Sequence, residues 1–336
     1  GTRWISINTE PLLTESGTGG AVATFSDITE RYEAEAARDR LIEILENTPD
    51  LIGFSAPSGE ILYLNRAARE FYGTDRPSPE RMREVHPQWA WDKVQNEGIP
   101  GALENGTWVG ETATLDAAGE ETPISQVILA HRDGRGELTR LATIMRDISQ
   151  QKALQQAVED RQRALRRLQD ITGDPARGLE DKLQAILQLG ADTFGLPYAI
   201  LSHIHGEDYG IRQAVSPEGT LAAGQHFDLG VTYCTHTLAA EGPVGFYRAG
   251  ESEIRDHPCF RAQGMEAYLG VPIPVGQEVY GTLNFSRPEP RAPYSDFEWE
   301  LLKLMGQWIS YELTREANRQ ALERERNLFV GGPTVI

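Results

Sequence analysis

Apolar side chains recur every three or four positions in a stretch that runs from Asp147 to Ile171 and contains neither Gly nor Pro. This spacing predicts one helix with a single narrow apolar stripe, surrounded by charged and amide side chains. Such a stripe favours a two-stranded coiled-coil seam with a partner helix, and the alternative is a helix packed against its own domain. The stripe consists of Leu154, Ala157, Ala164, Leu168 and Ile171, with Arg161 as its one charged position.

The start of this helix has the pattern of a capping box, because Asp147 is followed three residues later by Gln150. Asp27 opens a similar stretch near the N-terminus, where Ala34, Ala37, Leu41 and Ile44 repeat the spacing. The chain therefore carries an internal repeat of one strand-to-helix joint. We expect a signal relay through both joints and the seam, with Asp27, Asp147, Leu154, Ala157, Leu168 and Ile171 as its residues.

Runs rich in β-branched and aromatic residues, bounded by Gly, Pro, Asn and Asp, predict strands on both sides of this connector. They are residues 4–8, 21–26, 50–56, 60–64, 107–115, 122–132 and 138–146 before it, and residues 198–204, 210–216, 226–229, 243–247, 268–275 and 278–286 after it. Helices flank both groups, and Ser295 with Glu298 predicts a capping box for a long closing helix. Antiparallel strands packed with helices indicate the α+β class.

Composition narrows the choice of partners and of compartment. Asp and Glu (50) outnumber Lys and Arg (32), which gives a net charge of −18 and argues against a nucleic-acid-binding surface. Two cysteines are too few for a disulfide framework and indicate a reducing compartment. No apolar run approaches the ~20 residues that span a bilayer. We therefore expect a cytoplasmic protein with no membrane segment in this stretch.

The sequence NTPDLIGFSAPSGEILYLNRAAREFYG, followed by GTWVGETATLDAAGEETPISQVILAHRDGRGE and IMRDIS, resembles a PAS domain of bacterial sensor proteins. The resemblance implies a five-stranded antiparallel sheet with helices over one face and a cavity that sometimes holds haem, flavin or a small metabolite. The pocket residues it suggests are Phe54, Tyr63, Trp89, Trp108 and Gln126. His86 and His131 are the available haem ligands, although their loop and turn contexts favour surface or capping roles. A light-sensing flavin adduct would need a cysteine, which this block lacks.

The segments TYCTHTL and AYLGVPIPVGQEVYGTLNFSRPEPRAPYSDFEWELLKLMGQWISYEL resemble a GAF domain. The ligand-pocket residues that this resemblance suggests are Tyr233, Cys234, His236, Asp256, His257, Cys259, Tyr268 and Asn284. Three known chemistries of the family fit incompletely. Phe285 follows Asn284 where cyclic-nucleotide-binding members have Lys, Cys259 lies one residue too far from Asp256 for a bilin-attachment motif, and methionine sulfoxide reductases carry a further cysteine pattern.

Two residue pairs, Cys234 with His236 and His257 with Cys259, together offer a ligand set that zinc accepts. Each pair has one intervening residue where zinc modules have two to four, so we expect two buried cysteines and two loop histidines instead of a metal site. Asp256 followed by His257 suits a general base, but no nucleophile motif accompanies the pair. We predict no catalytic residues, and no cofactor is required by the sequence.

The resemblances divide the chain into alternating domains and helices. We expect the end of a preceding PAS domain (1–29), a linker helix (30–46), a PAS domain (47–149), a coiled-coil linker (150–171), a GAF domain (172–314), a C-terminal linker helix (315–330) and the start of a further PAS domain (331–336).

Such a chain is expected to be a regulatory sensor and relay module that responds to an unidentified small molecule or to redox state and forms a parallel homodimer along its helices. The resemblance implies an output domain of the histidine kinase or cyclic-di-GMP enzyme type, whose motifs are not in this sequence. The alternatives are a bilin-, haem- or metal-binding photo or redox sensor, and a methionine sulfoxide reductase that uses Cys259.

Overall fold

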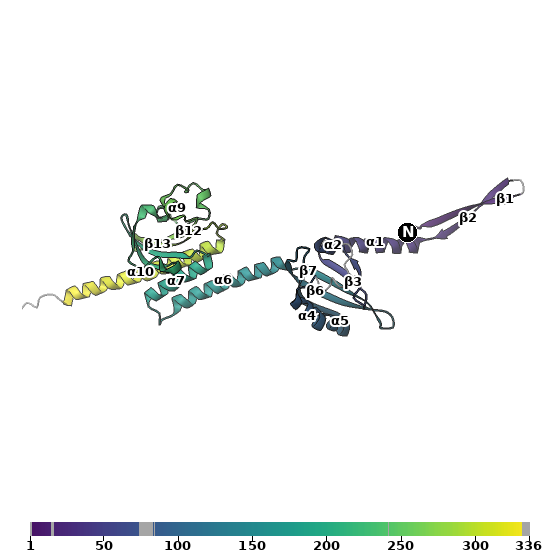
Figure 1. Ribbon diagram of the computed structural model, residues 1–336, viewed down its shortest axis with the longest axis horizontal. Coiled ribbons are helices and arrows are strands. Elements are labelled where there is room, and N and C mark those ends of the chain that lie inside the picture. The colour runs from purple at the N-terminus through teal and green to yellow at the C-terminus, as the bar shows by residue number, and fades with distance from the viewer. Residues whose placement is uncertain (1, 15–16, 74–82, 84, 241, 331–336) are drawn as a thin grey trace, which may run out of the picture. The chain divides into compact units, whose positions relative to one another are not determined.

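The computed structural model describes residues 2–14, 17–73, 83, 85–240 and 242–330, and the chain divides into two compact units, Gly1–Gln155 and Gln156–Ile336 (Figure 1). We call them unit 1 and unit 2. All the strand ranges predicted from the sequence overlap observed strands, so that prediction is confirmed within the described residues. Residues 331–336, where we expect a further domain to begin, lie outside them.

Unit 1 begins with a two-stranded hairpin, β1 (Ile5–Thr14) and β2 (Gly17–Asp27), which leads into helix α1 (Thr29–Asn47). Ile7 pairs with Phe25 across the hairpin, so both side chains lie on one face, and both are exposed. None of the residues of α1, all of which are described, is buried. The stripe of Ala34, Ala37, Leu41 and Ile44 is therefore open to a partner.

The main sheet of unit 1 has five antiparallel strands in the order β4-β3-β7-β6-β5. The strands are β3 (Leu51–Ser55), β4 (Ile61–Leu64), β5 (Thr107–Leu115), β6 (Glu121–Arg132) and β7 (Leu138–Asp147). Helix α2 (Arg66–Tyr72) follows β4, and a helical stretch of α4 (Gln88–Lys93), the π-helical segment Val94–Gly98 and α5 (Ile99–Asn105) precedes β5.

Asn65 organises the junction of β3, β4 and α2. Its side-chain oxygen accepts the N–H groups of Ala68 and Ile52, both at 3.0 Å, and so caps α2 while it fixes β3. Its Nδ2 donates to the carbonyl oxygens of Leu45 (3.0 Å) and Asp50 (2.8 Å). One buried amide thus ties the end of α1 to the sheet and to the next helix.

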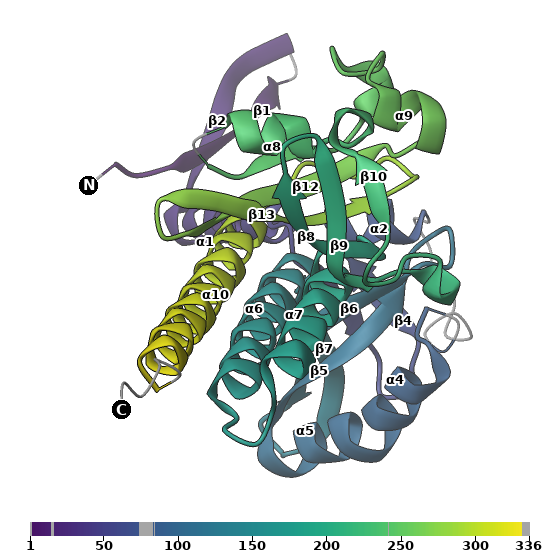
Figure 2. The same cartoon turned by 90° about the vertical axis from the view of Figure 1, so that its left-hand side faces the viewer.

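Unit 2 has a six-stranded antiparallel sheet in the order β10-β9-β8-β13-β12-β11. Its strands are β8 (Tyr198–His205), β9 (Asp208–Val215), β10 (His226–Asp228), β11 (Val244–Phe246), β12 (Ala267–Val275) and β13 (Glu278–Arg287). Helices α7 (Leu179–Phe194) and α10 (Asp296–Val330) cover one face, and the short helices α8 (Cys234–Ala239) and α9 (Pro258–Gln263) lie on the other (Figure 2).

The connector is one helix, α6 (Ser149–Gly173), and its stripe splits into two parts. Leu154 is 63% exposed, whereas Ala164, Leu168 and Ile171 are buried in the core that α6 shares with α7 and α10 of unit 2. The prediction that the whole stripe pairs with a second chain was therefore wrong for the second half of the stripe. That half packs on its own domain because it meets a broad apolar surface that removes more area from water than a narrow seam would.

Of the two predicted capping boxes, the one at Ser295 and Glu298 is confirmed, and at Asp147 the carboxylate bonds Ser149 instead of forming the predicted box with Gln150. Ser295 and Glu298 form the capping box of α10: the Glu298 carboxylate accepts from the Ser295 N–H (2.8 Å), and the Ser295 hydroxyl accepts from the Glu298 N–H (3.3 Å). At the two repeated joints, Asp27 accepts the N–H of Thr29 at 3.0 Å and Asp147 accepts that of Ser149 at 2.7 Å. Both joints thus fix the first turn of the helix from the last residue of the strand.

Candidate ligand cavity

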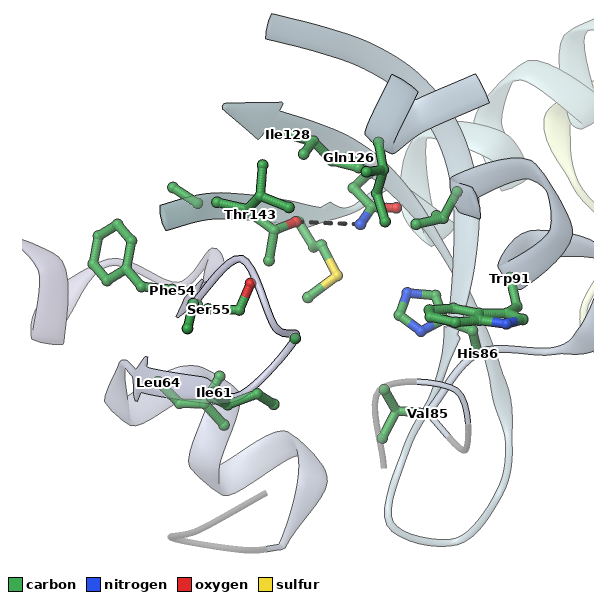
Figure 3. Close-up of a pocket in the computed structure, with 18 of the residues that line it drawn as sticks. Phe54, Ser55, Ile61, Leu64, Val85, His86, Trp91, Gln126, Ile128 and Thr143 are labelled. Carbon is green, nitrogen blue, oxygen red and sulfur yellow. Dashed lines mark hydrogen bonds between the residues drawn. The ribbon is translucent and has the colours of Figure 1, made fainter. Parts of the chain in front are cut away.

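A cavity of about 390 Å³ lies in unit 1 between the sheet and the segment that precedes β5 (Figure 3). Strands β3, β4, β6 and β7 form one side, and the other comes from α2, residues 85–86 and the α4-to-α5 stretch. The volume falls in the range of ~300–1,000 Å³ that is typical of small-molecule sites. The lining residues are Gly53, Phe54, Ser55, Ala56, Pro57, Ser58, Gly59, Ile61, Leu64, Tyr72, Val85, His86, Trp91, Val94, Ile99, Gln126, Ile128, Leu141, Ala142, Thr143 and Met145.

Gln126 supplies the main fixed polar group of the sheet side. Its Oε1 accepts from the Thr112 hydroxyl at 2.8 Å, and its Nε2 donates to the Thr143 hydroxyl at 3.2 Å (Figure 3). Gln126 and Thr112 are both buried. A buried amide held at both ends keeps one orientation, so this part of the wall is preorganised.

His86 and Trp91 bring aromatic rings to the opposite side of the cavity. Their ring centroids are 6.1 Å apart with an angle of 47° between the planes. His86 is only 6% exposed and faces the cavity (Figure 3). The expectation that it would be a surface or capping histidine was wrong, because the turn before α4 folds inward over the sheet. His131, the other histidine considered, is half-buried at the end of β6 and does not line the cavity.

The helical wall contains an irregular turn at the cavity. Val94 and Gly98 are the buried residues of the π-helical segment, and Val94 and Ile99 line the cavity. A π-helical turn widens the helix by one residue, and such turns are frequent at functional sites. In this protein the π-helical turn lies between α4 and α5 and contributes Val94 to the cavity wall.

The described lining of the cavity has few polar side chains. No Asp, Glu, Lys or Arg is among the lining residues, all of which the structure describes. Tyr72 is held neutral, because burial raises the pKa of its hydroxyl to about 12, and it bonds the Thr114 hydroxyl at 3.0 Å. The surface offered to a ligand is thus largely apolar with a few hydroxyl, amide and imidazole groups.

Of the pocket residues expected in this unit, only Gln126 presents its side chain to the cavity. Phe54 is among the lining residues, but it pairs with Ala142 on the opposite face of the sheet from Thr143, and Arg140 lies 5.8 Å from its ring centroid. Its ring points away in Figure 3.

The other three expected residues do not line the cavity. Tyr63 turns outward on β4 and donates to the Glu46 carboxylate at 2.8 Å. Trp89 is 50% exposed on the first turn of α4, and Trp108 packs against Gly98 and Gly101. Sequence reasoning missed the inward positions of β7, Leu141, Thr143 and Met145, which the alternation of that strand could have identified.

In unit 2 the expected pocket residues instead build a core between the sheet and α8 and α9. Tyr233, Cys234 and Tyr268 are at most 2% exposed. The Tyr268 hydroxyl bonds Thr237 at 2.6 Å and lies 3.6 Å from the Cys234 sulfur, which also accepts from the Thr282 hydroxyl at 3.2 Å. Asn284 extends this network, because its Nδ2 donates to the Tyr209 hydroxyl and to Thr282, both at 3.1 Å. These residues are satisfied by one another.

The remaining residues expected in that pocket lie around α9. The ring centroids of His236 and His257 are 5.2 Å apart, and His257 Nδ1 accepts the N–H of Cys259 at 3.1 Å as the N-cap of α9. Asp256 is exposed and pairs with Arg261. Over the described part of the chain, no group of three or more His, Cys, Asp or Glu side chains is placed to hold a metal ion.

Both cysteines are free and buried. Burial raises the pKa of the Cys234 thiol above its ordinary value and that of Cys259 to about 12. A thiol with so high a pKa has little of the thiolate form that attacks substrates or binds metals near neutral pH. Neither thiol therefore has the lowered pKa that is typical of an activated nucleophile.

No helix in the described ranges has the length and apolar character needed to cross a bilayer.

Family models match both units. A PAS domain model matches residues 49–150 and a GAF domain model matches residues 178–313. None of the curated proteins matches the sequence.

Solved structures that resemble the chain are distant. The PAS domain of a Colwellia psychrerythraea protein is 19% identical, with a TM-score of 0.32, and the match covers 34% of this chain and 98% of that one. The chromophore-binding domain of Stigmatella aurantiaca phytochrome P1 is 12% identical, with a TM-score of 0.38 and coverages of 80% and 98%. That of the bacteriophytochrome RpBphP3 from R. palustris is 11% identical, with a TM-score of 0.39 and coverages of 80% and 94%.

Proposed function

Because the chain is a tandem of a PAS domain and a GAF domain, we propose that it is the sensing and relay module of a cytoplasmic signal-transduction protein, and that the PAS cavity receives the signal. The observation that carries this proposal is the cavity between sheet and helices, one wall of which is β7, the strand that leads directly into α6. The buried, free thiols of Cys234 and Cys259 suit a reducing compartment.

The relay begins at the cavity wall. Thr143 and Met145 line the cavity on β7, and Asp147 ends that strand by accepting the first N–H of α6. A ligand that displaces either side chain acts two to four residues from the joint. Such a displacement can bias the start of α6 between two arrangements if the ligand binds one of them better.

We propose that the module acts as a parallel homodimer along its helices. The stripe of α1 is exposed over its length, and Leu154 and Ala157 continue an exposed apolar stripe in the first half of α6. Apolar residues at three-four spacing on an otherwise charged helix gain by pairing with a second copy. The buried half of α6 then passes a movement into the core of the GAF domain, which it shares with α10.

Arg212 joins α10, the last helix of the GAF domain, to α7 and to the sheet. Its guanidinium donates to Glu180 on α7 at 2.7 Å, to Glu316 on α10 at 3.0 Å and to the Tyr280 hydroxyl at 3.1 Å. These contacts fix α10 against the sheet where the helix continues toward its end. We propose that an effector domain, of the histidine kinase or cyclic-di-GMP enzyme type, receives the movement from there.

Disulfide cross-linking at position 154 tests both the dimer and the relay. In Leu154→Cys the introduced thiols of two copies meet across the seam, so mild oxidation should give a covalent dimer. Gln156→Cys, on the opposite side of the same helix, should cross-link at least tenfold more slowly. Adding Val94→Phe, which fills the PAS cavity, should change the rate at Leu154→Cys, while Val109→Phe at an exposed position should not.

Two outcomes contradict the proposal. A chain that stays monomeric at high concentration by light scattering removes the dimer. Equal cross-linking rates with and without Val94→Phe, in a protein whose circular dichroism is unchanged, would show that the cavity is not coupled to α6.

A further inference from the structure

The walls of the PAS cavity carry chemistry that selects a class of ligand. Two arginines of the described part of unit 1 have partners away from the cavity: Arg140 lies over Phe54 on the other face of the sheet, and Arg69 pairs with Glu46 at 3.0 Å. No formally charged Asp, Glu, Lys or Arg is in the described lining. Burying an anion without a cation or several donors costs far more than a neutral group does. The lining therefore disfavours phosphates and carboxylates, including the anionic groups of haem and of flavin nucleotides.

Two of the polar side chains in the lining, Gln126 and Thr143, can donate hydrogen bonds at one place on the sheet. A glutamine amide has two N–H groups, and one of those on Gln126 is used by Thr143. The Thr143 oxygen accepts that bond, so its own hydrogen is available to donate. Thr112 fixes the Gln126 amide, which in turn bonds Thr143, and the paired strands β6 and β7 hold both residues in register. A ligand atom that meets them should be a hydrogen-bond acceptor.

The rest of the surface is apolar and partly aromatic. Ile61, Leu64, Ile128, Leu141 and Met145 surround the sheet side, and the Trp91 ring stands on the helical side (Figure 3). Apolar pockets with a few placed polar groups take ligands by burying their hydrocarbon surface and orienting one polar end. His86 adds an imidazole ring to the lining beside Trp91.

Resting on the proposed function of the same cavity, we propose that its ligand is an uncharged, largely apolar, ring-containing molecule whose carbonyl or ring-nitrogen acceptor is recognised by Gln126 and Thr143. The amide of Gln126 distinguishes acceptor-bearing ligands from plain hydrocarbons, and a described lining without Asp, Glu, Lys or Arg disfavours anions. Because Thr143 lies on β7, the same hydrogen bonds place the recognition step on the strand that enters α6.

Three compounds of similar size test this class with the complete chain: 2-acetylnaphthalene, which is neutral and has an acceptor, 2-naphthoate, which is an anion, and 2-ethylnaphthalene, which has no acceptor. Binding is measured by saturation-transfer NMR and titration calorimetry. We expect 2-acetylnaphthalene to bind at least tenfold more tightly than 2-naphthoate, a difference of about 1.4 kcal/mol. We expect a severalfold advantage over 2-ethylnaphthalene.

Substitutions at Gln126 and Thr143 test whether these residues cause the preference for the acetyl compound. Gln126→Leu keeps the volume and removes the amide, so the advantage of the acetyl over the ethyl compound should fall to about one. Gln88→Leu, an exposed change on α4, should leave it intact. If Gln126→Leu does not fold by circular dichroism, Thr143→Val gives the same test with a smaller change.

The outcomes separate this inference from the proposed function. Equal or tighter binding of 2-naphthoate, no binding of any of the three compounds, or an unchanged acetyl preference in a folded Gln126→Leu overturns the ligand class. None of these results affects the response of Leu154→Cys cross-linking to Val94→Phe, on which the relay depends.

Discussion

The two units solve the same packing problem in different ways. Each sets an antiparallel sheet against helices, but the PAS domain leaves a cavity of about 390 Å³ there, whereas the space below α8 and α9 in the GAF domain is occupied by the rings of Tyr209, Tyr233 and Tyr268. The inward residues explain the contrast. Gly53, Ser55 and Thr143 are small, and large aromatic residues stand at the inward positions of the GAF domain.

The polar groups of the two units also differ: those of the GAF domain bond one another in the core, whereas one of those in the PAS domain lines the cavity. In the GAF domain the hydroxyls of Tyr268 and Thr282 both bond the Cys234 sulfur, and Asn284 donates to the hydroxyls of Tyr209 and Thr282, so these groups have partners within the protein. In the PAS domain the Gln126 amide reaches the cavity surface. The comparison teaches that residues expected to line a pocket can bond one another in a packed core, and it is the reason that we propose the PAS domain as the site of signal input.

Removing a ring from the filled region should have the largest effect. Tyr268→Ala deletes a side chain that is 2% exposed and leaves Thr237 without its 2.6 Å partner. We expect a loss of ~3–5 kcal/mol in the free energy of unfolding of the GAF domain. Hydrogen exchange of the β12 and β13 amides measures it, with the β6 and β7 amides of the PAS domain as the internal control. A loss below ~1 kcal/mol would mean that this region is not tightly packed.

Enlarging a buried side chain should destabilise the packed GAF domain more than the PAS domain, which contains the cavity. Val271→Phe enlarges a buried residue of the GAF core and should cost ~1–3 kcal/mol or more through overpacking. Val94→Phe makes the same exchange at the cavity wall, where free volume receives the ring, and should cost less than ~1 kcal/mol. Chemical denaturation of both variants gives the comparison. Equal costs would show that the cavity does not accept a side chain.

Much of the architecture could be predicted from the sequence because it depends on local patterns. Runs of β-branched and aromatic residues between turn residues marked the strands, and Ser295 with Glu298 marked the start of α10. The second half of the α6 stripe was misassigned, since an apolar stripe of that width suits both a partner chain and its own core. His86 was missed for a similar reason: a histidine in a loop carries no periodicity that shows whether the loop folds inward.

In the GAF domain, His257 caps α9 with a ring nitrogen that can accept a hydrogen bond only when the imidazole is neutral. His257 Nδ1 accepts the Cys259 N–H, and burial, followed by the nearby charge of His236, lowers the pKa of His257 below its usual value of 6.5. Because the folded state binds this proton less readily, the stabilisation is present above pH 6.5 and is lost as the pH falls toward the folded pKa. His257→Ala should cost ~1 kcal/mol at pH 7.5 by removing the cap.

His257→Asn supplies a cap that does not titrate, so its stability should depend less on pH between 5 and 7 than that of the unchanged chain. His131→Asn in the PAS domain is the matched control and should leave the pH dependence of the GAF domain unaltered. A pH profile of His257→Asn that overlays that of the unchanged chain would exclude the cap as the titrating contact.

The smallest effect is expected where the PAS domain holds its incoming helix. The Glu46 carboxylate at the end of α1 accepts from Arg69 (3.0 Å), the Arg66 N–H (2.8 Å) and the Tyr63 hydroxyl (2.8 Å), much as Arg212 holds α10 in the GAF domain. The bond from Arg69 is the main reason that the pKa of Glu46 is lowered from 4.5. This contribution is therefore present above pH 4.5 and is lost as the pH falls through the lower folded value.

Glu46→Gln keeps the shape and one acceptor but removes the charge, so we expect a loss of ~0.5–1 kcal/mol at pH 7 for this half-exposed contact. The loss should shrink as the pH is lowered from 7 to 3, because the contribution of the charged carboxylate is lost as the pH falls through its lowered folded pKa. Denaturant unfolding at both pH values measures it, and Glu35→Gln, an exposed partner of Arg31 on the same helix, is the control. An equal loss at both pH values would assign the effect to shape rather than charge. In that case the contacts that hold α1 and α10 would have different physical origins. Arg212 holds α10 through ion pairs with two carboxylates, whereas Glu46 would hold α1 through its shape alone.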